Sequence, residues 1–135
     1  MMTDAEIEAF IRMFENCSLP RAEWTHQRHL IVALWYLTRR QEAQATQLIR
    51  EGIQRYNLSQ GNPTGYHETI TLAWVAVVQR FLAARDRTRS VSDLAEELLT
   101  SCGSKDYLLR YYTEHILMSD RARHQWIPPD RGEIL

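Results

Sequence analysis

The eight-residue run from Leu30 to Leu37 (Leu-Ile-Val-Ala-Leu-Trp-Tyr-Leu) constrains the fold more than any other part of the sequence. On a helix this run is apolar on every side, which is typical of a helix at the centre of a bundle. The segment 66–85 keeps apolar residues at helical spacing over three turns; these are Ile70, Ala73, Trp74, Val77, Val78, Phe81 and Leu82. The two segments therefore predict two central buried helices, over about 25–38 and 66–85.

Four other segments have apolar stripes at helical spacing, which predicts amphipathic helices over about 3–14, 41–56, 90–102 and 105–118. N-terminal caps are expected at Thr3 or Asp4, at Ser90 or Ser92, and at Ser104. No segment shows the sustained two-residue alternation of a strand, so no sheet is expected. The prediction is an all-α fold, a single-domain bundle of about five or six helices.

A chain of 135 residues is the size of one domain, so we expect residues 1–135 to form a single unit. The segment 119–135 is predicted to be a C-terminal tail. It contains Trp126 and Ile127, and two large apolar residues predict that the tail packs against the body. The same residues leave a homodimer interface open as the alternative.

The overall charge excludes some classes of protein. Sixteen basic and 17 acidic residues give a formal charge of −1, whereas a nucleic-acid-binding protein usually has a clear basic excess. The acidic N-terminus does not resemble a signal peptide, and the longest apolar run is too short to span a membrane. We expect a cytoplasmic protein that binds neither nucleic acid nor membrane, with Cys17 and Cys102 as reduced thiols.

Three of the five histidines fall in two short motifs. The first is Trp24-Thr25-His26-Gln27-Arg28-His29-Leu30. Residues three apart on a helix share a face, so His26 and His29 have a spacing that can chelate one metal ion, although such pairs are more often independent. The second is Gly65-Tyr66-His67-Glu68-Thr69-Ile70-Thr71, at the start of the second apolar helix. There, Glu68 also suits the positive end of the helix dipole.

The two motifs become more informative together. An up-down-up order of helices would make the helices 25–38 and 66–85 parallel, and their starts would then lie at the same end of the bundle. His26, His29, His67 and Glu68 would converge there. Three imidazoles with an open position describe a catalytic zinc-type site, whereas two histidines with a carboxylate suit non-heme iron.

The leading hypothesis is a small enzyme or metal-dependent protein that acts on a small molecule. His26, His29 and His67 would bind a divalent metal (Zn, Fe, Ni or Mn), or would orient the substrate without one. His67 and Glu68 would be the catalytic residues, with Glu68 as a fourth ligand or as the general base. The alternative is a non-catalytic ligand-binding or interaction module, in which the same side chains form a buried hydrogen-bond network that fixes the register of two helices.

The two motifs, together with the tail sequence Trp126-Ile127-Pro128-Pro129-Asp130, resemble a family of small all-helical bacterial proteins. Its members carry an aromatic-x-His-x-x-His-Leu motif and, later, Tyr-His-Glu-Thr at the start of a helix. The resemblance implies that His26, His29, His67 and Glu68 belong to a family signature. It implies neither an activity nor a substrate.

Overall fold

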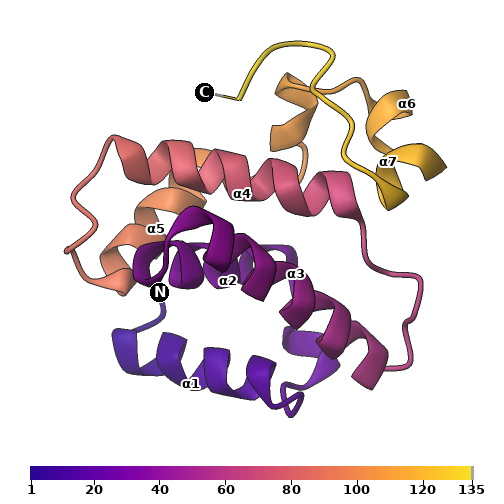
Figure 1. Ribbon diagram of the computed structural model, residues 1–135. Helices are drawn as coiled ribbons and strands as arrows, with labels where there is room; N and C mark the ends of the chain where they lie inside the picture. Colours follow the sequence, from indigo (N-terminus) through magenta and orange to yellow (C-terminus); the bar gives the residue numbers. More distant parts are fainter. Residues whose placement is uncertain (135) are drawn as a thin grey trace.

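The computed structural model describes residues 1–134, and in this range the chain forms seven α-helices, two 3-10 helices and no strand (Figure 1). The α-helices are α1 (Asp4–Glu15), α2 (His26–Arg39), α3 (Glu42–Ser59), α4 (Glu68–Ala83), α5 (Val91–Cys102), α6 (Glu114–Leu117) and α7 (Asp120–His124). The 3-10 helices are Arg21–Glu23 and Tyr107–Arg110. The all-α prediction is confirmed.

Side-chain caps explain where several helices begin. Thr3 caps α1 in a reciprocal box, because its hydroxyl accepts from the Glu6 amide at 3.1 Å while its own amide donates to the Glu6 carboxylate at 2.9 Å. Thr25 and Ser90 cap α2 and α5 through their hydroxyls in the same way. The polar residues that precede each apolar stripe therefore fix the starts of these helices.

Helix α2 packs against α3, α4 and α5, and α4 also contacts α3, α5 and α7. Seven of the 14 residues of α2 are buried, and they lie on all sides of the helix: Leu30, Ile31, Val32, Ala33, Leu34, Tyr36 and Leu37. Helix α4 buries eight side chains, among them Trp74 and Phe81. Burial of this apolar surface is the main source of stability of the bundle.

The segment 105–118 differs from the single helix that its apolar spacing predicts. It forms a 3-10 turn and, after a break, the short helix α6. The returning C-terminal segment binds the backbone at the break: the Thr113 amide donates to Asp130 at 2.9 Å and the Arg131 amide donates to the Tyr111 carbonyl at 2.9 Å. These long-range bonds replace the local bonds of a continuous helix. The described part of the chain therefore has more α-helices than the five or six predicted, and the two additional short ones, α6 and α7, lie after residue 113.

The predicted tail 119–135 begins with α7, which contacts α4. Beyond α7, Thr69 at the start of α4 bonds to the Gln125 carbonyl at 2.7 Å and to the Ile127 amide at 3.1 Å. Leu135, the last residue of the predicted tail, lies outside the described residues. Among residues 1–134, no helix combines the length and the apolar character needed to cross a membrane.

Candidate functional site

The starts of α2 and α4 lie on the same side of the bundle but are staggered. The His26 ring lies 5.3 Å from the Trp74 ring of α4, and beyond the far end of α4 Arg87 donates to the Leu37 carbonyl of α2 at 3.2 Å. The contacts follow in the same order along both helices, so α2 and α4 run parallel. However, Trp74 lies six residues after Glu68, which is about 9 Å along a helix axis. The two histidine motifs therefore occupy different levels of the bundle.

His67 is buried, with 8% of its surface exposed, and both of its ring nitrogens are bonded within the protein. Its Nδ1 accepts from the Ile70 amide at 3.1 Å, which caps α4, and its Nε2 donates to the Leu117 carbonyl at 2.9 Å. Burial lowers the pKa of His67, so the neutral ring is favoured. A metal ion could bind this imidazole only by replacing one of the two hydrogen bonds.

Glu68 is joined to α3 and to the loop before α4. Arg50 forms a two-point ion pair with it, with Nε to Oε1 at 3.1 Å and Nη2 to Oε2 at 2.8 Å, and the Tyr66 hydroxyl donates to Oε1 at 2.5 Å. Burial, together with the bond to this carboxylate, raises the pKa of Tyr66 to about 12. The Tyr66 hydroxyl therefore remains a donor at neutral pH, and the two carboxylate oxygens of Glu68 accept three hydrogen bonds.

The rings of His26 and His29 pack against different aromatic neighbours, although the two residues are three apart on one helix. The His29 ring stacks on Trp24 at 3.8 Å between centroids, and its Nδ1 donates to the Thr25 carbonyl at 2.7 Å. The His26 ring packs edge-on against Trp74, and its buried Nε2 has no hydrogen-bond partner among the described residues. Within residues 1–134 no group of three or more His, Cys, Asp or Glu side chains is placed to hold a metal ion.

The burial of His29 predicts that the protein loses stability in mild acid. Burial lowers the pKa of His29 from its ordinary value of 6.5 to about 4, so the unfolded chain takes up a proton before the folded chain does. The contribution of neutral His29 to the free energy of unfolding is fully present above about pH 7, and it decreases as the pH falls from 6.5 toward 4. We expect a loss of about 1 to 2 kcal/mol between pH 7 and pH 5.

Urea unfolding at a series of pH values measures this effect. His29→Gln is the matched variant, because an amide can still donate to the Thr25 carbonyl but does not titrate, so its stability should depend less on pH. Burial also lowers the pKa of His26 and His67, and a residual slope of the same sign is therefore expected in this variant. An equal slope in wild type and variant would contradict the assignment to His29.

A polar pocket of about 620 Å³, which we call the Glu68 pocket, opens between α3, the loop before α4, and α7. It is lined by Arg50, Gln54, Pro63, Thr64, Tyr66, Glu68, Asp120, Arg123 and His124. Arg123 is half-buried and donates through Nη1 to the carbonyls of Thr64 and Tyr66, at 3.0 and 3.2 Å. Glu68 and Asp120 line the same pocket, but within the described chain no carboxylate lies within ion-pair distance of the Arg123 guanidinium.

Sequence reasoning identified Glu68 but missed Arg50 and Arg123. Arg50 lies on the polar face of an amphipathic helix, and Arg123 lies in the predicted tail. Neither position has a spacing that relates it to Glu68, since 18 residues separate Arg50 from Glu68 and the contact of Arg123 with Tyr66 spans 57 residues. These partners come from the tertiary fold.

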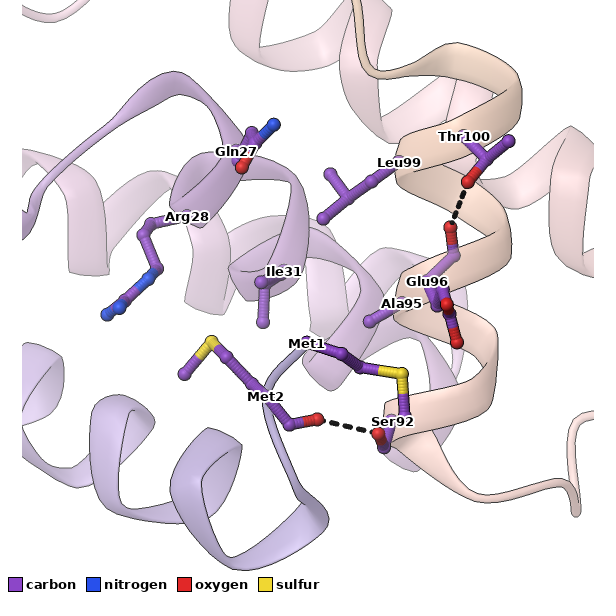
Figure 2. A pocket seen from close by; sticks show the side chains of 10 residues that line it. All are labelled: Met1, Met2, Gln27, Arg28, Ile31, Ser92, Ala95, Glu96, Leu99 and Thr100. Carbon is purple, nitrogen blue, oxygen red and sulfur yellow. Dashed lines mark hydrogen bonds between the residues drawn. The ribbon is translucent and has the colours of Figure 1, made fainter.

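A second depression, the N-terminal groove, lies between the residues before α1, the first turns of α2, and α5 (Figure 2). Its volume is about 570 Å³. Buried Ile31 and Ala95 form its floor together with Leu99 and Met2, and Arg28 and Glu96 stand on opposite sides. None of the four predicted site residues lines it, although Arg28 comes directly before His29 in the sequence.

Comparison of the chain with protein-family models, with curated proteins and with solved structures gave no match. The family resemblance of the two histidine motifs therefore stays a prediction.

Proposed function

We propose that the protein is a non-catalytic binding module for a small polar anion, with the Glu68 pocket as its site. Of the two functions considered from the sequence, this alternative has more support from the contacts of the predicted residues. His67 has both nitrogens bonded within the protein, and Glu68 accepts three donors. The imidazole of His67 has no free nitrogen for a metal ion, and three donors hold the Glu68 carboxylate against α3 and the loop before α4, which supports a role of both residues in holding elements of the fold together.

The single observation that carries the proposal is the charge of Arg123. Its Nη1 donates to two backbone carbonyls, its other guanidinium nitrogens have no hydrogen-bond partner among the described residues, and the side chain lines a pocket of about 620 Å³. Arg50 is already paired with Glu68, and Asp120, the other carboxylate of the lining, is not within ion-pair distance of Arg123, so Arg123 is the cation of the pocket that no carboxylate pairs. A planar guanidinium fixed at one nitrogen is well suited to bind a carboxylate or phosphate through its other donors.

Inorganic phosphate is a suitable first probe, titrated into the protein by calorimetry at constant ionic strength with chloride as the reference anion. We expect saturable binding that weakens about tenfold or more in Arg123→Gln, because a charge-assisted hydrogen bond contributes roughly 1.5–3 kcal/mol. Arg121→Gln is the matched control, since Arg121 is exposed on the same short helix and does not line the pocket. Equal affinity in the two variants would contradict the proposal.

The enzyme hypothesis, with His26, His29 and His67 around a divalent metal and Glu68 as general base, is tested by metal analysis of the purified protein. Under our proposal, the metal content of wild type should be far below one equivalent and should not change in His26→Ala or His67→Ala. One equivalent of zinc, iron, nickel or manganese that is lost in both variants would overturn our proposal in favour of the metal site. A cytoplasmic location and a homodimer stay predictions.

A further inference from the structure

The N-terminal groove combines an apolar floor with Arg28, a cation that forms one long ion pair with Glu23 and no side-chain hydrogen bond. Ile31 and Ala95 line its bottom and are 3% and 5% exposed, so each is fixed in the core and presents only a small apolar surface to the groove. Met2 and Leu99 extend this apolar surface on either side (Figure 2). Methionine adapts its shape easily to an apolar partner because its side chain is unbranched and flexible.

Arg28 is the cation of the groove. Its guanidinium lies over the Phe10 ring, 4.8 Å from the centroid, and the side chain is 24% exposed. The nearest carboxylate, that of Glu23, is 3.8 Å away, which is too long for a hydrogen bond. Among residues 1–134 the Arg28 guanidinium donates no hydrogen bond. It is therefore held in place by stacking while its N–H groups remain available.

We propose that the N-terminal groove binds a medium-chain aliphatic carboxylate, with the carboxylate on Arg28 and the chain on Ile31, Ala95 and Leu99. The charges of the groove set the orientation, since Glu96 on the opposite side repels a carboxylate. A volume of about 570 Å³ is in the range of small-molecule pockets. The site is distinct from the Glu68 pocket, which shares no lining residue with this groove.

The length of the ligand chain provides a test that needs no variant. Burial of each additional methylene should lower the dissociation constant about fourfold. Calorimetry with hexanoate, octanoate and decanoate, each below its micelle concentration, should show this progression. Octanol has as many carbon atoms as octanoate but ends in a neutral hydroxyl group in place of the carboxylate. We expect it to bind at least tenfold more weakly than octanoate, because it cannot form an ion pair with Arg28.

Variants locate the binding site. Arg28→Gln should weaken octanoate binding about tenfold, and Arg12→Gln, at an exposed arginine of α1 outside the groove, should leave it unchanged. Arg123→Gln should also leave octanoate binding unchanged, which separates this proposal from that for the Glu68 pocket. An affinity independent of chain length, octanol binding as tight as octanoate binding, or equal affinity in Arg28→Gln and Arg12→Gln would each overturn the proposal.

Discussion

Replacement of His67 by alanine should lower the free energy of unfolding by about 3 kcal/mol, one of the two largest effects that we expect. The variant loses the N-terminal cap of α4, for which roughly 1 kcal/mol is typical. It also leaves the Leu117 carbonyl without its donor, and Leu117 is buried, so this adds about 1–3 kcal/mol. Urea unfolding measures the change.

Two further variants separate the contributions to this loss. His67→Asn keeps a side chain that caps well but is too short to reach Leu117, so it should recover only the capping part, about 1 kcal/mol. His124→Ala removes an exposed imidazole and should change stability by less than about 0.5 kcal/mol. If His67→Ala were as stable as His124→Ala, the structural role of His67 would be wrong.

The structural role of His67 also explains why the sequence predicted the fold better than the site. Helix positions follow from local patterns, and the predicted caps Thr3 and Ser90 stand at the starts of α1 and α5. The break in the segment 105–118 depends on bonds from Asp130 and Arg131, which no local pattern contains. The local spacing of apolar residues predicts where helices form, and hydrogen bonds from the C-terminal segment, which is distant in the sequence, interrupt one of them.

The same limit applies to the histidines. The order of the helices correctly gives α2 and α4 as parallel, but it does not give the stagger that sets His26 level with Trp74. The spacing of His26 and His29 gives a shared face, but it does not say which aromatic ring each imidazole contacts. The position of each imidazole depends on a bulky neighbour, because Trp24 covers the ring of His29 and Trp74 covers the ring of His26.

Residues of the Tyr66-His67-Glu68-Thr69 motif bind different elements of the fold. His67 binds α6 through Leu117, Glu68 binds α3 through Arg50, and Thr69 binds the C-terminal segment. Three consecutive residues thus connect the start of α4 to three separate elements. The motif combines an imidazole, a carboxylate and hydroxyls, and in the structure each of these kinds of group also holds the start of α4 to another part of the fold.

Thr69→Val should have the second large effect, a loss of about 2 kcal/mol confined mainly to the C-terminal segment. Thr69 is fully buried, and its hydroxyl donates to the Gln125 carbonyl while it accepts from the Ile127 amide. Valine fills the same volume without the hydroxyl, so both backbone groups lose their partner. Since Gln125 is exposed, the segment can escape this penalty by leaving α4, which limits the cost.

Hydrogen exchange distinguishes detachment of the segment from general destabilisation. We expect the Ile127 amide to exchange about 30-fold faster in Thr69→Val, as 2 kcal/mol implies, while amides in the middle of α2 change much less. Thr71→Val is the matched control, because the Thr71 hydroxyl donates to the His67 carbonyl within the same turn and holds no distant element. If exchange in α2 and at Ile127 accelerated equally, Thr69 would stabilise the whole bundle, and the C-terminal segment would be an integral part of the core.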